Sequence, residues 1–226
     1  MATSLLDRAI YSYGDVDRLA DLRPGTARRW LDGYVRTGVF YEPVLRAEHT
    51  GSEAVTWGEM VEARLLAEFR DRKVPVARMR PAIELLRKEF GPYPLAQARP
   101  FLDVEGRDLV RVIQSRVGLE RELQLVVVRS NQLVLTEEAE RFRSAVEYQG
   151  NVARYLRPAE RAREVVMDPE RAFGQPAVRS VRTESLAEDF QAGTSREDLA
   201  DLYDLSLEQV DSAIRFELIT RRERVA

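Results

Sequence analysis

The sequence predicts a mainly α-helical protein with small β elements, in which a winged helix–turn–helix domain precedes a three-helix, helix–turn–helix-like domain. Two observations predict this class. Short amphipathic segments that begin at capping residues and end at glycine occur near both ends of the chain. Apolar runs of strand length lie between them. We therefore expect a winged-helix domain over 1–92, a strand-rich connecting or dimerisation region over 93–150, and a C-terminal domain over 151–226.

Two short helices joined by a tight turn are expected near the start of the chain. Apolar residues at positions 16, 19, 20 and 22 give one apolar face to a helix over 15–22. The turn is Arg23-Pro24-Gly25, Thr26 is a natural N-cap for a second helix over 27–31, and Gly33 ends that helix. This is the helix–turn–helix pattern, whose second helix enters the major groove of DNA.

A wing and two longer helices are expected next. Strand-like pieces at 38–41, 43–46 and 54–57 surround a polar turn at 49–52, which predicts a β-hairpin. A helix over 57–70 follows, with Thr56 as its cap. A further helix ends near Phe90, and Pro81 either starts or kinks it.

From Pro92 onward, a proline-rich loop and apolar runs of strand length replace the helical pattern. Strand-like runs are expected at 101–102 and 109–113. Residues 123–128 and 133–135 flank a Ser130-Asn131 turn and predict a β-hairpin. A helix is expected to run from Thr136 to about Tyr148. The hairpin is either a dimer interface or a strand pair inside one subunit's core.

Three helices are expected in the last third of the chain. They are predicted at 183–191, 195–203 and 206–215, with Gly193 between the first two. The third helix carries a capping box, because Ser206 is followed three residues later by Gln209.

Composition excludes several classes of protein. The absence of cysteine excludes disulfides, thiolate metal sites, iron–sulfur clusters and cysteine nucleophiles, and the one histidine, His49, excludes a His-rich metal site. No apolar run approaches the ~20 residues that span a bilayer. The N-terminus lacks the apolar core of a signal peptide, so we expect a soluble cytoplasmic protein that does not bind membranes.

No enzyme motif is present. The sequence contains no GxGxxG, P-loop, GxSxG or HExxH pattern, and His49 lies in a polar turn typical of a solvated loop histidine. The acids at 137–140 begin a helix, where carboxylates favour the helix dipole without any catalytic role. We expect no enzymatic activity, no cofactor and no bound metal.

The net charge of −3 conceals two regions of opposite sign. Residues 23–36 carry a net charge of +3, whereas residues 183–217 hold 2 basic and 10 acidic residues, a net charge of −8. Arginine bonds phosphates and guanine edges, so the first region predicts binding to double-stranded DNA, unless the segment is a helical hairpin with solvated arginines. The acidic region opposes DNA and suits a basic protein partner or a solvated surface. The DNA-binding candidates are Arg23, Thr26, Arg28, Arg29 and Arg36.

The N-terminal segment resembles MerR-type winged-helix DNA-binding domains. The resemblance is carried by residues 13–30, which read YGDVDRLADLRPGTARRW, and continues through 55–66 and 74–80. It implies that Thr26 and Arg28 contact operator DNA. The chain departs from the MerR pattern in lacking the long dimerisation helix after this domain and the cysteines of the metal-sensing members. Metal-responsive activation is therefore not expected.

The C-terminal segment resembles the family called domain of unknown function 433, through residues 168–183 and 191–217. The whole chain is similar to mycobacterial VapB-type antitoxins. The resemblance implies an antitoxin that neutralises a PIN-like ribonuclease toxin by direct binding and represses its own operon. We expect a homodimer, because operator half-sites repeat with a protein's two-fold symmetry. The acidic surface would face the toxin's basic rim, and C-terminal arginines would reach its acidic groove. The toxin-binding candidates are Glu197, Asp198, Asp201, Arg221, Arg222 and Arg224.

An alternative function belongs to a different class. The chain could be a MerR-like transcriptional regulator that responds to a small molecule and has no toxin partner, with a C-terminal region that dimerises or senses the ligand. A neighbouring reading frame that encodes a small acid-rich nuclease would favour the antitoxin.

Overall fold

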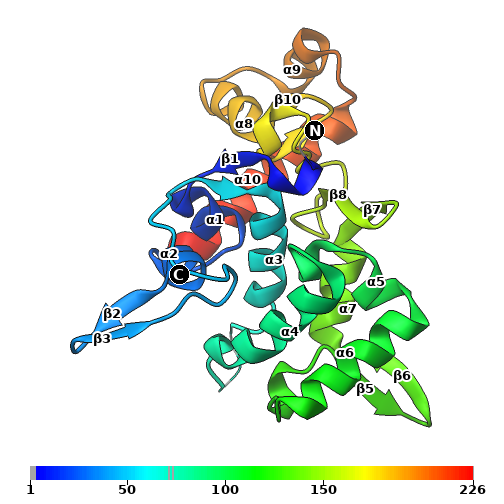
Figure 1. Ribbon diagram of the computed structural model, residues 1–226. Helices are drawn as coiled ribbons and strands as arrows, with labels where there is room; N and C mark the ends of the chain where they lie inside the picture. The colour runs from blue at the N-terminus through cyan, green and yellow to red at the C-terminus, as the bar shows by residue number, and fades with distance from the viewer. Residues whose placement is uncertain (1–3, 71, 73, 226) are drawn as a thin grey trace. The chain divides into compact units, whose positions relative to one another are not determined.

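The computed structural model describes residues 4–70, 72 and 74–225, with side chains up to residue 220. The chain forms two compact units, Met1–Ala153 and Arg154–Ala226. Their elements are drawn in Figure 1. Among the described residues, no helix combines the length and the apolar character that crossing a bilayer requires.

The first half of unit 1 contains the predicted helix–turn–helix. Its elements are η1 (Leu5–Asp7), β1 (Ala9–Tyr11), α1 (Tyr13–Leu19), α2 (Thr26–Asp32), β2 (Tyr34–Arg36), β3 (Val39–Tyr41), β4 (Val55–Thr56), α3 (Trp57–Ala67), η2 (Val76–Met79) and α4 (Arg80–Phe90). Capping boxes begin α1 at Ser12 and α3 at Thr56, so the cap predicted for α3 is confirmed. Pro81 lies in the first turn of α4, which confirms that the helix starts there.

The second half of unit 1 is richer in helix than the sequence predicts. Its elements are η3 (Pro94–Ala96), α5 (Arg99–Leu102), α6 (Val104–Arg116), η4 (Arg121–Leu123), β5 (Val126–Arg129), β6 (Gln132–Leu135), α7 (Glu137–Ala145), β7 (Val146–Gln149) and β8 (Val152–Leu156), the last of which crosses the boundary between the units. The predicted hairpin is confirmed, because β5 and β6 pair antiparallel around Ser130 and Asn131.

The strands predicted at 101–102 and 109–113 are wrong. Both segments are helical, in α5 and α6. In α6 the buried residues Gly106, Val110 and Ile113 follow helical spacing, so the apolar run forms one buried face of a helix. A Cβ at Gly106 would lie 2.1 Å from the carbonyl oxygen of Arg99, so only glycine allows α5 and α6 this close approach. The helix predicted from Thr136 also ends earlier than expected, at Ala145.

The centre of unit 1 is α3. Ten of its eleven residues are buried, including the carboxylates of Glu59 and Glu62. The indole Nε1 of Trp57 donates to the carbonyl oxygen of Ala153 at 2.8 Å, so the polar atom of this fully buried side chain is satisfied. Leu31 of α2 is also fully buried, and α2 contacts α3. Helix α2 therefore shares a core with α3.

The wing differs from the predicted hairpin. The strands that pair are β2 and β3, with Val35 opposite Phe40, whereas residues 43–46 form no strand. Strand β4 pairs instead with β1. The predicted turn at 49–52 is a loop whose polar groups are bonded to α2, as described below.

Unit 2 contains the three predicted helices. Its elements after β8 are η5 (Ala172–Gly174), β9 (Ala177–Val178), β10 (Val181–Arg182), α8 (Thr183–Gln191), α9 (Arg196–Tyr203) and α10 (Leu207–Val225). The capping box predicted at Ser206 is confirmed, because its hydroxyl accepts from Gln209 N at 3.2 Å and the Gln209 side chain accepts from Ser206 N at 3.0 Å. Helix α10 continues beyond the predicted end at residue 215. An apolar cluster with Leu186, Leu199 and Val210 joins the helices.

Candidate nucleic-acid interface

Helix α2, the second helix of the helix–turn–helix, is capped by a side chain of α1. Its N-cap is Gly25, which has a φ of 80° and no side chain to bond the first turn. The carboxylate of Asp17, on α1, supplies the missing acceptor, because it accepts from Gly25 N at 2.6 Å and from Ala27 N at 2.7 Å. Thr26, predicted to be the N-cap, is instead the first helical residue, so that prediction is wrong. Asp17 is buried and fixes α1 against the start of α2.

The two faces of α2 differ in character. Ala27 and Leu31 are fully buried, and Asp32 is 5% exposed. Arg28 and Arg29 are exposed on the other side of the helix. One face of a short helix is thus anchored while the other presents guanidinium groups to solvent.

The predicted DNA-binding arginines lie in the turn before α2, on α2 and on the wing. Arg23 and Arg36 are exposed, and Arg29 Nη2 donates to Thr26 Oγ1 at 2.9 Å. Within the described part of the chain, Arg23, Arg28 and Arg36 form no ion pair with a carboxylate. Their guanidinium groups are therefore available to an external anion.

The wing presents Arg36 at its tip. Thr37 and Gly38 both have positive φ, 50° and 77°, as a two-residue hairpin turn requires. Figure 1 shows the β2–β3 hairpin extending away from α1 and α2. Gly33 links α2 to the wing, and a Cβ there would lie 2.4 Å from the carbonyl oxygen of Tyr41. Only glycine fits this link, which sets the direction of the wing.

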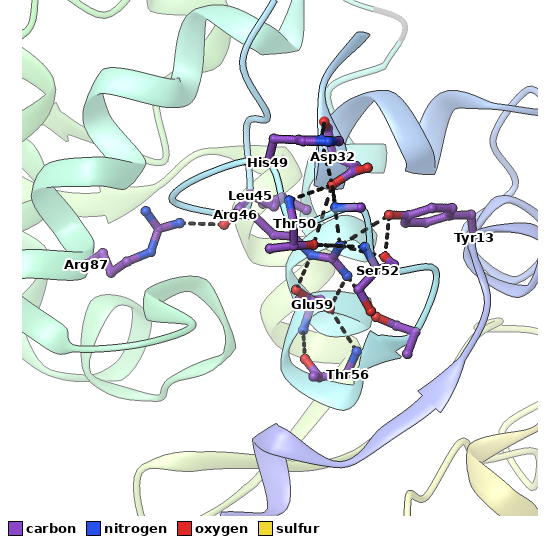
Figure 2. A network of polar contacts seen from close by, with 12 residues as sticks. Tyr13, Asp32, Leu45, Arg46, His49, Thr50, Ser52, Thr56, Glu59 and Arg87 are labelled. Carbon is purple, nitrogen blue, oxygen red and sulfur yellow. Dashed lines mark hydrogen bonds and ion pairs between the residues drawn. The ribbon is translucent and has the colours of Figure 1, made fainter.

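A buried ion pair holds the loop after the wing against α3. Arg46, whose side chain is 8% exposed, donates from Nε to Glu59 at 2.7 Å and from Nη2 to the same carboxylate at 3.2 Å. It also donates to the carbonyl oxygens of Ser52 and Ala54, both at 2.8 Å. Figure 2 shows these contacts converging on one guanidinium group. Arg46 thereby ties the loop to the first turn of α3.

Asp32 connects the end of α2 to the same loop. One of its oxygens accepts from Thr50 N and Gly51 N, both at 2.9 Å, and lies 3.1 Å from Nδ1 of His49. Burial raises the pKa of the Asp32 carboxyl, but these two backbone hydrogen bonds and the charges of His49 and Arg46 outweigh burial and lower the pKa below its ordinary value. His49, predicted to be solvated, is exposed but bonded to α2.

Sequence reasoning identified the outward arginines but missed the groups that position them. Asp17 acts across eight and ten residues of sequence, and Arg46 lies in a loop that reads as featureless. The available signals were weak: a glycine at an N-cap position, and a capping-box Glu59 that the prediction did not use. Neither signal indicates that Asp17 would cap α2 or that Arg46 would pair with Glu59.

The predicted toxin-binding residues lie in unit 2. Glu197, Asp198 and Asp201 are exposed on α9, and Asp198 is also bonded to the N-cap Ser195. Beside them, Leu202 is 68% exposed, so α9 presents an apolar side chain within an acidic surface. The remaining candidates lie outside the residues whose side chains are described: Arg221, Arg222 and Arg224.

No metal site accompanies these surfaces among the described residues, where no three His, Cys, Asp or Glu side chains are grouped to hold an ion.

Comparison with known proteins now adds to this geometry. Over 99% of its length the chain is 41% identical to "Uncharacterized protein Rv2308" of Mycobacterium tuberculosis, of which it covers 95%. The chain belongs to the family of that protein. Residues 9–83 match the family described as "Putative DNA-binding HTH domain", and residues 165–216 match "Protein of unknown function (DUF433)". The first match covers α1, α2 and the wing, and the second covers the helices of unit 2 as far as residue 216.

A curated protein and a solved structure from M. tuberculosis also resemble the chain over most of its length. "Putative antitoxin VapB45" is 29% identical over 92% of this chain and 93% of its own. The crystal structure of Rv2018 superposes with a TM-score of 0.74 and 28% identity, covering 92% of this chain and 99% of that one. Both the helix–turn–helix and the DUF433 segment are thus parts of a single shared architecture.

Proposed function

We propose that this protein is a non-enzymatic antitoxin that binds operator DNA through a MerR-like winged helix and represses its own operon. The observation that carries the proposal is the exposure of Arg23, Arg28 and Arg36 on the turn, α2 and the wing, with no carboxylate partner among the described residues. Binding to DNA depends on neutralising phosphates, and arginine also reads guanine edges. The antitoxin part of the proposal draws on the name of the relative VapB45.

The rigid support behind α2 favours the same function. Asp17 fixes the start of the helix and Asp32 its end, so the outward arginines keep a constant spacing. A recognition helix needs this rigidity, because hydrogen bonds to base edges tolerate little displacement. We propose that Thr26 and Arg29 contact the DNA backbone at the N-terminal end of α2.

The DNA-binding proposal is tested by titrating the full-length protein with a duplex from the region upstream of its own reading frame. We expect binding that weakens as salt is raised, and weaker binding to a scrambled duplex of equal length. Equal affinity for both duplexes at two salt concentrations would contradict an operator-specific role.

We further propose that the acidic face of α9 binds a PIN-like ribonuclease toxin. Glu197 and Asp201 complement a basic rim around an RNA-binding groove, and Leu202 supplies an apolar contact. The test is co-expression with the neighbouring reading frame. Co-purification, together with loss of the neighbour's RNA cleavage, is expected. If the two proteins separate and cleavage is unchanged, the antitoxin proposal is wrong.

A homodimer is proposed because operator half-sites repeat with a protein's two-fold symmetry. Light scattering at operator-binding concentrations tests this, and a monomer on a single half-site would contradict it. A second candidate function, a regulator that responds to a small molecule without a toxin, keeps the same DNA-binding face. An arginine-lined cavity in unit 1, described next, is the observation in its favour.

A further inference from the structure

A cavity of about 570 Å³ lies in unit 1, between α6, the β5–β6 hairpin and the start of α7. Figure 1 shows the hairpin beside α6. Its volume is in the range of small-molecule sites. Four arginines and two glutamates line it: Arg72, Arg111, Arg121, Arg129, Glu137 and Glu138. None of the residues that line this cavity belongs to α2 or the wing.

Both glutamates of the cavity already have partners. Glu138, 5% exposed, forms an ion pair with Arg72. Glu137 forms an ion pair with Arg141, from Oε1 to Nη1 at 3.0 Å. Arg141 lies outside the lining, so its charge offsets that of Glu137 from behind. Among the described residues, neither carboxylate pairs with Arg111, Arg121 or Arg129.

The remaining arginines give the cavity its positive character. Arg111 pairs with Asp108, at 2.9 Å, on the exposed side of α6. Among the described residues, Arg121 and Arg129 form no ion pair. One lies on η4 and the other at the end of β5, so two separate elements each direct an uncompensated cation toward one space. Such convergence favours an anionic occupant.

A polar atom without a partner also belongs to the cavity lining. The hydroxyl of Thr136 is buried and forms no hydrogen bond with the described residues. Thr136 is the N-cap of α7, yet its side chain does not accept from the first turn of that helix. A buried hydroxyl normally finds a partner, so this one is an unsatisfied polar group beside the cavity, although neighbouring atoms cover its oxygen. By contrast, the buried amide of Gln114 is fully used by Leu125 and Val126.

We propose that this cavity binds a small organic oxyanion, a phosphate ester or a polycarboxylate. The forked guanidinium groups of Arg121 and Arg129 match the paired oxygens of either group. Val127 of β5 provides an apolar contact for the organic part. The proposal depends on neither operator binding nor a toxin.

The experiment is calorimetric titration of the full-length protein with defined probes. Adenosine monophosphate and glucose 6-phosphate represent phosphate esters, citrate represents polycarboxylates, and adenosine and glucose are their uncharged controls. We expect at least one of the three anions to bind, whereas the uncharged controls should not bind. Whether a phosphate ester or citrate binds then shows which class of oxyanion the cavity accepts. Failure of all three anions to bind at millimolar concentration, or equal binding of the uncharged controls, would overturn the proposal.

Matched variants locate the binding. Arg121→Gln and Arg129→Gln each should weaken binding about tenfold or more, because each removes a charge-assisted hydrogen bond. Arg116→Gln, on α6 but outside the lining, should leave binding unchanged. An equal loss of binding in Arg116→Gln would overturn the site, because it would show that the anion responds to overall positive charge. Displacement of the anion by operator duplex would also overturn it, because the arginines would then belong to a DNA-binding surface.

Discussion

The molecule contains two short-helix motifs that look alike in outline and differ in what they present. In unit 1, α2 directs Arg28 and Arg29 outward. In unit 2, α9 directs Glu197 and Asp201 outward, next to the exposed Leu202. The first surface attracts a polyanion and the second repels it. The difference shows that a helix–turn–helix outline alone does not assign DNA binding, because the function depends on the side chains placed on it.

The two motifs also differ in what holds them. The end of α2 is braced by buried charges, with Arg46, Asp32 and Glu59 all less than one-tenth exposed. The helices of unit 2 meet instead through the apolar cluster that contains Leu186, Leu199 and Val210. Buried charges tolerate little change, because a charge that loses its partner remains desolvated. Variants can therefore separate the two units by their mode of stabilisation.

The largest expected effect follows from removing the central cation of unit 1. Arg46→Met leaves the carboxylates of Asp32 and Glu59 buried without their shared partner, and should lower the free energy of unfolding by about 3–5 kcal/mol. Urea denaturation measures the loss, and hydrogen exchange should show it in α2 but not in α10. Arg36→Met, on the exposed wing, is the control and should change stability by less than about 0.5 kcal/mol. An equal loss of hydrogen-exchange protection in α10 would show that the two units unfold together. The two units would then not differ in how they are stabilised.

A second prediction concerns pH. Burial raises the pKa of the Glu62 carboxyl to about 8, against the lowering effects of the hydrogen bond from Leu95 N and the charge of Arg87. Its ordinary pKa is 4.5, so the stability that the protonated group contributes is full below that pH and is lost as pH rises toward 8. Unit 1 should therefore become less stable across this interval, by on the order of 1 kcal/mol per pH unit from this group.

Glu62→Gln should flatten that dependence, because the amide does not titrate. Denaturation of the wild type and the variant at several pH values measures the difference. Glu197→Gln, on the exposed surface of α9, serves as the matched control and should leave the slope unchanged. A wild-type slope that persists in Glu62→Gln would assign the pH dependence to another group.

The third prediction compares the two outward faces directly. Arg28→Ala should weaken operator binding by about 1–3 kcal/mol if it reads a base, or reduce the salt slope by about one if it binds a phosphate. Asp201→Ala, at a similar outward position on α9, should leave operator affinity unchanged or slightly higher, because it removes a negative charge. Fluorescence anisotropy at two salt concentrations measures both. Unchanged operator affinity in Arg28→Ala would remove that residue from the interface.

Sequence alone predicted the features that local chemistry determines. The helices α3, α4 and α8 to α10 begin near the expected residues because caps, prolines and glycines act within one turn. The outward arginines of α2 were predicted for the same reason. The apolar run at 109–113 was misassigned, because β-branched residues favour strands while packing against α5 places them in a helix.

Tertiary partners were beyond reach of the same reasoning. Nothing local marks Asp17 as the cap of α2, since the acceptor and the amide groups come from different helices. Arg46 is similarly one arginine among 33, and only the folded chain brings it to Glu59. The ion pairs that leave Arg121 and Arg129 uncompensated were equally invisible. A sequence shows which charges exist, whereas the fold determines which are neutralised.

The smallest expected effect concerns the side chains that cap the N-termini of α2 and α9. Asp17→Ala removes two acceptors from α2 and should cost about 2 kcal/mol, whereas Ser195→Ala removes one from α9 and should cost about 1 kcal/mol. Native-state hydrogen exchange measures each loss in its own helix. Although Asp17 is buried, Asp17→Ala should also weaken operator binding, because the first turn of α2 frays and its arginines lose their fixed spacing.

Asp17→Asn retains one carbonyl acceptor and should recover part of that affinity, which a purely electrostatic effect of the lost negative charge would not do. Ser195→Ala should leave operator affinity at the wild-type value, because α9 presents no DNA-binding surface. If the two cap variants weaken operator binding equally, the acidic helix takes part in DNA recognition and the division of functions between the units is wrong. If only Asp17→Ala does so, then a side chain that cannot touch DNA controls its recognition through helix geometry alone.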